Sequence, residues 1–403
     1  MKIAVLKFGG SSLKNLTRIK KVAQIIKNTF KKGYFPCVVV SAMGDTTDYL
    51  LHLAKKLNKK PPERELAMLL SSGERISAAL LSIALQEIGI EAVSFTGSQI
   101  GIITDNDFTE ARIKMIKGGR LKEALRKNKV PIVMGFQGVS FDKEITLLGR
   151  GGSDITAIAL AIALDANHCE IYSDVAGVYT EDPYLFKKVK LIEKLTYEEM
   201  FELGSFGAEV LHPRACLLAE KYNLKLFLKS SFNKKGETMI TNEKEFEEIK
   251  VKGITHQKDL VLFSLINIPK KTKCLHQVIS YLSERKLQPL FFSHGLPDKN
   301  LFDLIFIVKK EVASECEDLL KRLKKEVGWK KILKKGKMAS FSLVGSEIGH
   351  SGEILQKLFA TLTKNHVHIE GFALSPNRIT CFLPEKNLKK TIALLLKTFQ
   401  LTR

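Results

Sequence analysis

The sequence predicts an α/β protein: an N-terminal open sheet with helices on both faces, followed by two small ferredoxin-like domains. Short β-rich runs alternate with helix-like segments up to about residue 250. Several runs end in glycine or small polar residues, where open α/β sheets place their ligands. After residue 250, the order strand, helix, strand, strand, helix occurs twice.

The N-terminal part carries the elements of the predicted open sheet. Its strand-like runs are short and apolar, as buried strands are. The segments between them have apolar residues at a spacing of three or four, which is typical of helices that cover a sheet. The predicted strands are 3–6, 37–40, 92–95, 130–134 and 170–173, and the predicted helices are 14–31, 66–88 and 155–164.

The C-terminal part has an internal βαββαβ-like repeat without a cluster of catalytic-looking residues. Its expected task is to bind a small ligand or another subunit. The domain boundaries that we predict are 1–250, 255–330 and 335–403. The first copy is expected at 260–266, 274–286, 290–293, 301–308 and 312–326, and the second at 339–344, 352–365, 368–373, 378–383 and 385–399.

The composition excludes several protein classes. Of 403 residues, 45% are hydrophobic and 27% charged, which excludes a disordered chain. No apolar run approaches the roughly 18–20 residues of a membrane helix, and residues 3–6 are too few for a signal-peptide core. The six cysteines are scattered without a Cys-x-x-Cys pair, so neither a zinc site nor a disulfide framework is expected. We expect a soluble, cytoplasmic protein without a membrane partner.

The chain is strongly basic, with 64 Lys+Arg against 43 Asp+Glu and a net charge of +21. Such a balance suits nucleic acid, an anionic membrane surface or an anionic substrate such as ATP. The lysines fall in runs such as 55–56 and 334–335 without interleaved aromatic residues, and no nucleic-acid-binding signature is present. A solvated lysine-rich surface is therefore favoured, and no nucleic-acid partner is expected.

The first chemical motif, Lys-Phe-Gly-Gly-Ser-Ser at 7–12, joins a predicted strand to a helix. Gly9 and Gly10 let backbone N–H groups approach a phosphate, and the helix N-terminus adds partial positive charge. Lys7 supplies a full charge. A tight turn without a ligand explains the pattern about as well, so the motif alone is a weak signal.

A stronger motif, Gly-Arg-Gly-Gly-Ser-Asp at 149–154, feeds the apolar helix predicted at 155–164. Arg150 can grip a carboxylate with two hydrogen bonds, and Asp154 can orient a lysine or a metal-bound phosphate. N-capping explains Ser153 or Asp154 without function, but it does not explain an arginine between glycines. This loop therefore favours a functional site.

Three further junctions are ambiguous singly: 71–75, 173–183 and 206–213. Glu74 in the first of these suits a substrate ammonium if it faces a cleft, although it also complements a helix dipole. The histidines, including His212, are expected to be packed or on the surface rather than metal ligands. No metal site is predicted.

Together and in this order, these motifs resemble the aspartokinases of the amino-acid kinase family. The resemblance covers nearly the whole chain, because that family also carries two C-terminal ACT domains. It rests on Lys-Phe-Gly-Gly-Ser-Ser at 7–12, Val-Ser-Ala-Met-Gly at 40–44 with Thr47, Ser-Gly-Glu-Arg at 72–75, Gly-Arg-Gly-Gly-Ser-Asp at 149–154, Ser-Asp-Val-Ala-Gly-Val-Tyr-Thr-Glu-Asp-Pro at 173–183 and Phe-Gly-Ala-Glu-Val-Leu-His-Pro at 206–213.

The resemblance implies ATP-dependent phosphorylation of the β-carboxylate of L-aspartate, the first step towards lysine or diaminopimelate, threonine and methionine. Mg²⁺ would be carried by the nucleotide. Lys7 and Asp154 would be catalytic, and the implied substrate-binding residues are Ser41, Thr47, Glu74, Arg150 and Ser153. The implied ATP-binding residues are Lys7, Gly9, Gly10, Ser11, Ser173, Asp174, Tyr179, Tyr184, Glu209 and Val210.

Two positions depart from the family pattern. The family usually has arginine where this chain has Tyr184, and lysine where it has Glu209. Both positions normally lie by ATP, so two positive charges are lost and one negative charge is gained. We hypothesise weaker or altered nucleotide binding rather than loss of activity, because Lys7, Glu74 and Arg150 remain.

The resemblance also implies feedback regulation and assembly through the ACT domains, as a homodimer or homotetramer. The domain order and the absence of a fused dehydrogenase resemble a monofunctional, lysine-pathway enzyme, so lysine is the expected effector. The stretch 286–290 argues against an unaltered lysine site, because Pro289 lacks a backbone donor and no carboxylate is present there.

Three alternatives stay open at lower weight. The first is another amino-acid kinase, such as a glutamate 5-kinase, a nucleotide kinase or a carbamate kinase. The second is an amino-acid sensor whose kinase domain has decayed, which only Tyr184 and Glu209 support. The third is nucleic-acid binding through the positive charge.

Overall fold

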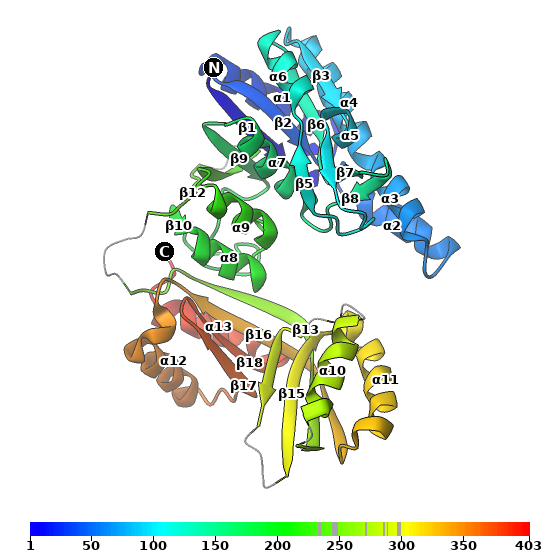
Figure 1. Ribbon diagram of the computed structural model, residues 1–403. Coiled ribbons are helices and arrows are strands. Elements are labelled where there is room, and N and C mark those ends of the chain that lie inside the picture. Colours follow the sequence, from blue (N-terminus) through cyan, green and yellow to red (C-terminus); the bar gives the residue numbers. More distant parts are fainter. Residues whose placement is uncertain (233–234, 244–248, 271, 285–286, 288, 296–299) are drawn as a thin grey trace. The chain divides into compact units, whose positions relative to one another are not determined.

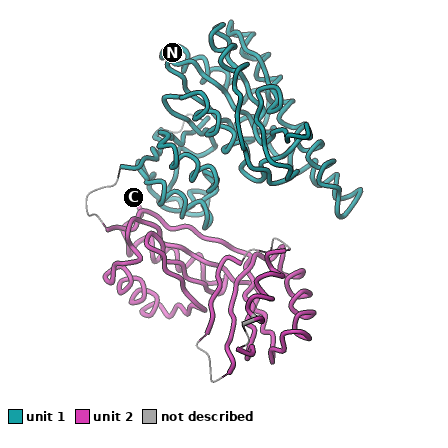
Figure 2. Tube along the Cα trace, in the orientation of Figure 1, with its two compact units in different colours: residues 1–248 teal, residues 249–403 magenta. Residues whose placement is uncertain are grey.

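The computed structural model describes residues 1–232, 235–243, 249–270, 272–284, 287, 289–295 and 300–403. The chain divides into two compact units, Met1–Glu248 and Ile249–Arg403 (Figure 2). Each unit is described by itself. The predicted α/β fold class is confirmed.

The first unit is built on an eight-stranded sheet in the order β10-β12-β11-β9-β1-β2-β6-β3 (Figure 1). The strands pair in parallel throughout, except for the antiparallel pair β11 and β12. The carboxyl ends of the parallel strands therefore meet at one edge. The strands are β1 Ile3–Phe8, β2 Phe35–Val40, β3 Ala92–Phe95, β6 Val130–Met134, β9 His168–Ser173, β10 Lys194–Thr196, β11 Leu226–Ser230 and β12 Thr238–Thr241.

Helices cover both faces of this sheet. On one face, Leu6 and Phe8 of β1 belong to a buried cluster with α1 (Leu16–Lys31) and α4 (Ser72–Glu87). The helix α7 (Gly152–Ala163) contacts β1, β2 and β9. Because side chains alternate along a strand, Lys7 points to the opposite face from Leu6 and Phe8, towards α7.

A smaller four-stranded sheet, in the order β5-β4-β7-β8, completes the core of this unit. The sequence patterns missed it because its strands are only three or four residues long. Its strands are β4 Ile102–Thr104, β5 Ile113–Ile116, β7 Gln137–Ser140 and β8 Ile145–Leu147. The remaining helices of the unit are η1 Gly10–Leu13, α2 Thr46–Leu57, α3 Glu63–Leu70, α5 Gly97–Ile100, α6 Gly119–Arg126, α8 Tyr197–Ser205 and α9 Pro213–Lys221.

The second unit is one six-stranded antiparallel sheet, in the order β14-β15-β13-β16-β18-β17. The two sequence repeats share this sheet, because the long strands β13 and β16 pair along both halves. The strands are β13 Gly253–Pro269, β14 Phe291–His294, β15 Leu301–Lys309, β16 Lys331–Val344, β17 Gly371–Ser375 and β18 Arg378–Pro384. The helices are α10 Thr272–Glu284, α11 Lys310–Val327, η2 Ile348–His350, α12 Gly352–Lys364 and α13 Glu385–Thr398.

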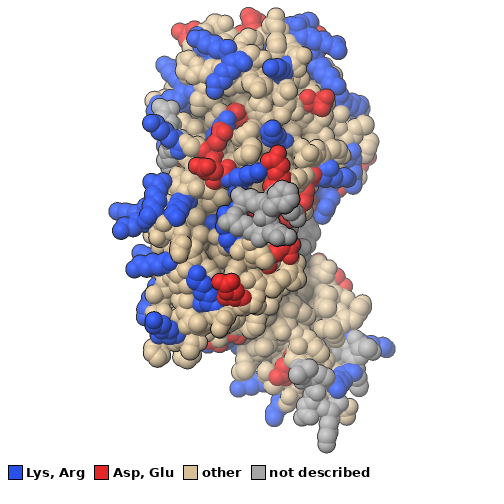
Figure 3. All heavy atoms as spheres, turned by 90° about the vertical axis from the view of Figure 1, so that its left-hand side faces the viewer, with Lys and Arg blue, Asp and Glu red and all other residues tan. Residues whose placement is uncertain are grey.

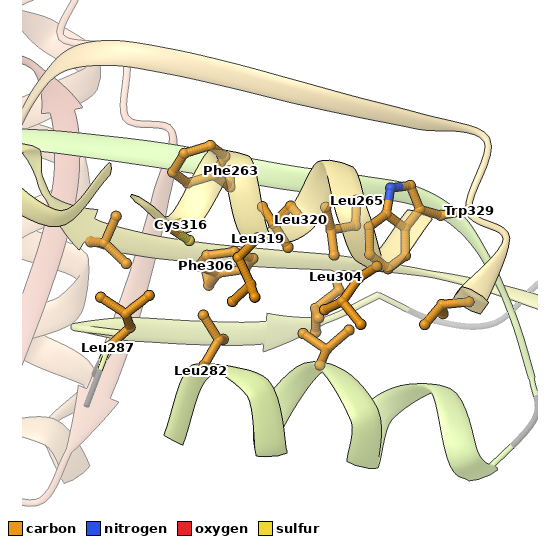
Figure 4. Close-up of a cluster of buried hydrophobic side chains, with 14 of the residues drawn as sticks. Phe263, Leu265, Leu282, Leu287, Leu304, Phe306, Cys316, Leu319, Leu320 and Trp329 are labelled. Atoms are coloured by element: carbon orange, nitrogen blue, oxygen red, sulfur yellow. The ribbon is translucent and has the colours of Figure 1, made fainter. Parts of the chain in front are cut away.

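Buried side chains from the sheet and from α10 and α11 form the core of one half of the second unit. Figure 4 shows Phe263 and Phe306 among leucines from both helices, with Trp329 at one end of the cluster. The rings of Phe263 and Phe306 stack with centroids 5.5 Å apart. This packing of hydrophobic side chains stabilises the half.

The single helix predicted over 66–88 is two helices, α3 and α4, which meet at Ser71. Among the described residues, the stretch Glu63–Glu87 is long and apolar enough to cross a membrane by length and composition alone. This differs from the expectation that no such stretch exists. Half of its apolar window is buried inside the protein, as in the core helix of a globular domain.

Lysine and arginine side chains are spread over the face shown in Figure 3, with acidic residues between them. They do not gather there in a single stripe. Five described cysteines (Cys37, Cys169, Cys216, Cys316 and Cys381) are free and buried. They therefore act as small core side chains.

Candidate active site

The glycine turn after β1 lies at the carboxyl edge of the large sheet. The N–H of Gly9 donates to the carbonyl of Tyr172 over 3.2 Å, and the N–H of Ser41 donates to the carbonyl of Phe8 over 3.1 Å. A Cβ at Gly10 would lie 2.8 Å from the carbonyl oxygen of Gly44, so only glycine fits there. The ends of β1, β2 and β9 are thereby held together.

The helix expected directly after this turn starts later. The 3-10 turn η1 occupies Gly10–Leu13, and α1 begins only at Leu16 with Asn15 as its N-cap. The side chain of Arg18, in the first turn of α1, donates to the carbonyl of Ser11. The dipole of α1 is therefore set back from the glycines, and Lys7 is the main positive charge beside them.

Lys7 of β1 and Asp154 of α7 form an ion pair that joins the sheet to this helix. The Nζ atom of Lys7 lies 2.6 Å from Oδ1 of Asp154, and their side chains are 13% and 9% exposed. Asp154 lies in the first turn of α7, and its Oδ2 atom accepts the N–H of His212 over 3.3 Å. The structure therefore brings together the two residues that the sequence predicts as catalytic.

The glycine-rich loop before α7 sets the position of this pair. Gly149 and Gly151 have φ values of +80° and +69°, which favour glycine. A Cβ at Gly135, at the end of β6, would lie 2.7 Å from Oγ of Ser153. Ser153 is buried, whereas Arg150 is exposed in the turn and makes no ion pair within the part of the chain that the structure describes.

Glu74 is a buried carboxylate with one unused oxygen. Its Oε1 atom accepts the N–H of Ala42 over 3.1 Å, while its Oε2 atom is buried without a hydrogen-bond partner among the described residues. Burial raises the pKa of Glu74 to about 7, although the backbone hydrogen bonds act in the opposite direction. A cationic ligand would stabilise the charged form of this carboxylate, because it replaces the favourable interactions with water that burial removes.

Of the other predicted substrate residues, Ser41 is tied to α4 and Thr47 lies on α2. The hydroxyl of Ser77, one turn further along α4, donates to the carbonyl of Ser41 over 2.7 Å and ties α4 to the end of β2. Thr47 is half-buried in the first turn of α2. Gly73 allows this packing, because a Cβ there would lie 2.8 Å from Cβ of Ala42.

The predicted nucleotide residues Ser173 and Asp174 lie at the end of β9 and directly after it, next to the glycine turn. The hydroxyl of Tyr184 donates to Oδ2 of Asp174 over 2.8 Å, and the Tyr184 side chain is largely exposed. Tyr179 is half-buried, and Glu209 and Val210 lie in a turn with Glu209 exposed. The structure thus joins Tyr184 directly to a predicted nucleotide residue.

Sequence reasoning missed Ser231, which connects the two loops. Its hydroxyl lies 2.8 Å from Oγ of Ser12 and donates to the carbonyl of Ser173 over 3.0 Å. Ser231 is buried directly after β11. Its position at the end of a strand was the signal that could have identified it.

Sequence reasoning also missed Glu170, a buried carboxylate within β9. Glu170 is buried and accepts hydrogen bonds from Lys229 over 2.7 Å and from the hydroxyl of Tyr172 over 2.8 Å. Burial raises the pKa of Glu170, but hydrogen bonds from His168, Lys229 and Tyr172 together with the charge of Lys229 outweigh it and lower the pKa to about 2. A glutamate inside a strand that was predicted to be buried was a usable signal.

The segment after α8 contacts the glycine-rich loop before α7 at both ends. The Arg214 guanidinium donates to the carbonyl of Leu148 over 2.8 Å and to that of Ala111 over 3.0 Å. Burial lowers the pKa of His212, and its Nδ1 atom accepts the N–H of Arg214 over 3.3 Å. This segment therefore contacts Leu148 through Arg214 and Asp154 through the His212 backbone.

Comparison with known proteins adds the family. The model of the amino acid kinase family matches residues 2–230. An aspartokinase of Thermus thermophilus is 38% identical over 405 residues, covering all of both chains. The predicted family resemblance is confirmed by these matches.

Solved structures agree on the fold. E. coli aspartokinase III in complex with aspartate and ADP superposes with a TM-score of 0.83 at 21% identity, covering 99% of this chain and 100% of that one. Aspartate kinase from Synechocystis is 34% identical with a TM-score of 0.56, covering 99% of this chain and 69% of that one. The chain belongs to the aspartokinases of the amino acid kinase family.

Proposed function

We propose that this chain transfers the γ-phosphoryl group of ATP to the β-carboxylate of L-aspartate, giving 4-phospho-L-aspartate and ADP. The observation that carries the proposal is the Lys7–Asp154 pair, with 2.6 Å between Nζ and Oδ1, at the edge where the glycine turn and the glycine-rich loop meet. Membership of the aspartokinases supports the same reaction.

The reaction needs positioning and charge neutralisation more than proton transfer. The β-carboxylate is ionised at pH 7, so no general base is required for its attack on phosphorus. The ammonium of Lys7 can neutralise the transferring phosphoryl group, and Asp154 holds that ammonium in place. The new bond joins a carboxylate oxygen to phosphorus, while the bond to the bridging oxygen breaks and ADP leaves.

The substrate is proposed to bind through its charged α-groups. The α-ammonium can donate a hydrogen bond to the unused Oε2 atom of Glu74. This contact would give the buried carboxylate the cationic partner that it lacks. Arg150 is exposed beside the site and can form two hydrogen bonds with the α-carboxylate. Ser41, Thr47 and Ser153 complete the proposed substrate site.

The nucleotide is proposed to lie between the glycine turn and the loop after β9. The backbone at Gly9, Gly10 and Ser11 would contact the phosphates. The remaining parts of the nucleotide would contact the other predicted ATP-binding residues, which are Ser173, Asp174, Tyr179, Tyr184, Glu209 and Val210. Mg²⁺ would be held mainly by phosphate oxygens. Among the described residues, no group of three or more His, Cys, Asp or Glu side chains is placed to hold an ion.

The second unit is proposed to regulate the first. Residues 1–250 would be the catalytic domain, and 255–330 and 335–403 two ACT modules that share one sheet through β13 and β16. We propose lysine as effector and assembly as a homodimer or homotetramer, on the basis of the family pattern. The altered stretch around Pro289 bears on this site, and Lys286 and Gln288 lie outside the described residues.

A hydroxamate assay tests the proposed reaction. The purified chain is incubated with ATP, Mg²⁺ and L-aspartate, and the acyl phosphate is trapped with hydroxylamine. Product is expected from L-aspartate and not from L-glutamate or carbamate, and chelation of Mg²⁺ should abolish it. Product from L-glutamate alone would contradict the proposed substrate. A parallel titration with lysine, in which neither heat nor inhibition is seen, would contradict the proposed effector.

A further inference from the structure

A groove in the first unit lies outside the site described above. Its volume is about 580 Å³, within the size range of small-molecule sites. It runs between β5, the edge strand of the small sheet, and the helices α7 and α9. Its lining residues are Arg112, Ile113, Lys114, Met115, Ile116, Ile155, Ala159, Ile162, Ala163, Arg214, Leu217, Leu218, Lys221 and Tyr222.

The floor of the groove is apolar, and apolar side chains of its walls are reachable by solvent. The helix α7 contributes Ile155, Ala159 and Ile162, and the opposite wall carries large apolar side chains on β5 and α9. Met115 and Leu217 are 46% and 47% exposed, so the groove leaves apolar surface in water. A ligand with a hydrocarbon or aromatic body would cover this surface favourably.

The charges around the groove have one sign. Four of its lining residues are cationic (Arg112, Lys114, Arg214 and Lys221), and none is acidic. Lys114 is paired with Asp105, whose Oδ2 atom lies 3.6 Å from Nζ of Lys114. Glu110 also acts on Arg214, but neither acid lines the groove.

We propose that this groove binds a small amphiphilic anion: an alkyl or aryl body that carries one carboxylate or sulfonate group. The apolar floor suits the body, and the four cations suit the charged head. A second copy of the same patch fits less well, because a two-fold contact would place the same cations against each other. The volume matches a small molecule rather than a protein surface.

A ligand in the groove is expected to change the conformation of the glycine-rich loop at 149–154. Arg214 lines the groove and at the same time donates to the carbonyl of Leu148, two residues before Arg150. Ile155 of the floor directly follows Asp154 on α7. An anion that draws the Arg214 guanidinium towards the groove would therefore shift the loop proposed to bind the substrate carboxylate.

Fluorescence of 8-anilinonaphthalene-1-sulfonate, an aryl sulfonate, tests the binding site on the full chain. We expect saturable binding that decanoate displaces and that decyltrimethylammonium, with the same chain length and opposite charge, does not. Lys221→Glu should weaken binding about threefold to tenfold, because it replaces one attraction by a repulsion. Lys225→Glu is the matched control, since Lys225 is exposed and does not line the groove.

The outcomes separate cleanly. Equal weakening by Lys221→Glu and Lys225→Glu, or equal displacement by the two decyl compounds, would overturn the site. Leu217→Asp, compared with Leu57→Asp on the 91% exposed end of α2, tests the apolar wall in the same way. In the kinetic arm, which rests on the proposed function, decanoate should change the KM for aspartate at least twofold in the parent. The same change in Lys221→Glu should need about threefold to tenfold more decanoate. An unchanged KM in the parent would overturn the link to the glycine-rich loop.

Discussion

The ammonium of Lys7 and the carboxylate of Asp154 meet 2.6 Å apart although 146 residues separate them in sequence. The contact forms because Lys7 points from β1 to the face that α7 covers, and Asp154 lies in the first turn of α7. Two glycines with positive φ lead into that turn. One lysine is thus fixed at the edge where phosphates are proposed to bind.

Glu74 should make aspartate binding pH-dependent. Its pKa is raised to about 7 by burial, so its carboxylate becomes charged as pH rises through 7. Since the charged form is proposed to bind the α-ammonium, kcat/KM for aspartate should rise between about pH 6 and 8. In Glu74→Gln this rise should be lost and the KM for aspartate increased at least tenfold. Glu87→Gln, at the exposed end of α4, is the control.

Glu74 should also make the folded state less stable as pH rises. The folded-state pKa of about 7 lies above the ordinary value of 4.5, so the folded state binds more protons between these values. Its contribution to stability is fully present below pH 4.5 and is lost as pH rises towards 7. Urea unfolding at pH 5 and 8 should show a smaller loss in Glu74→Gln than in the parent. An equal loss in both would contradict the assignment.

Gly10→Ala should destabilise the glycine turn. A Cβ there would lie 2.8 Å from the carbonyl oxygen of Gly44 and 2.9 Å from that of Ala42, and neither backbone group can move freely. We expect a loss of about 1–3 kcal/mol in the free energy of unfolding. Gly119→Ala, where a Cβ meets nothing within 4 Å, should be neutral or stabilising by up to about 1 kcal/mol. Similar midpoints for the two variants would contradict this account.

Glu209 and Tyr184 should weaken ATP binding. Glu209 is exposed in a turn, and Tyr184 is hydrogen-bonded to Asp174. Glu209→Lys, which replaces a repulsion by an attraction, should lower the KM for ATP several-fold, and Tyr184→Arg should act in the same direction. Glu63→Lys on the exposed first turn of α3 has the same change in charge and serves as control. An ATP KM that Glu209→Lys leaves unchanged would remove the hypothesis.

Removing Lys229 should leave Glu170 buried without its main cationic partner. The Nζ atom of Lys229 lies 2.7 Å from Oε1 of Glu170. We expect Lys229→Met to cost about 3–5 kcal/mol in unfolding free energy, and Lys225→Met, at an exposed site before β11, to cost little.

The pH dependence follows from the depressed pKa of Glu170, about 2. The contribution of this carboxylate is present above its ordinary pKa of 4.5 and is lost as pH falls towards 2. The stability deficit of Lys229→Met relative to the parent should therefore be largest above pH 4.5 and should shrink as pH falls towards 2, which urea unfolding at several pH values measures. A deficit that does not change over this range would contradict the role given to Lys229.

The sequence predicted much of the fold because its longest signals are local. The apolar pattern predicts the buried strand at 130–134 and the helix that ends at Lys31, and the glycine motifs mark the strand ends. The break between α3 and α4 at Ser71 was missed, because the apolar pattern continues through it. The sharing of one sheet by both repeats depends on the pairing of β13 with β16, which local patterns do not encode.

For the site, residue types indicated chemistry but not contacts. Lys7 and Asp154 were predicted from glycine-rich motifs, and their ion pair follows only from the packing of α7 on the sheet. Ser231 was missed because a serine after a strand is common, and its role depends on two distant loops. The unused oxygen of Glu74 likewise required the burial of α4 against the end of β2.

The role of Lys7 is tested by acyl phosphate formation from L-aspartate in Lys7→Gln, with Lys20→Gln on the exposed face of α1 as the control. If Lys7 neutralises the transferring phosphoryl group, kcat should fall about 100-fold or more in Lys7→Gln. The unfolding midpoint should fall as well, because Asp154 is left buried without its cationic partner, so the rate is measured at a temperature at which the variant is folded. Lys20→Gln should keep the parental rate. A folded Lys7→Gln variant with parental kcat would contradict the account.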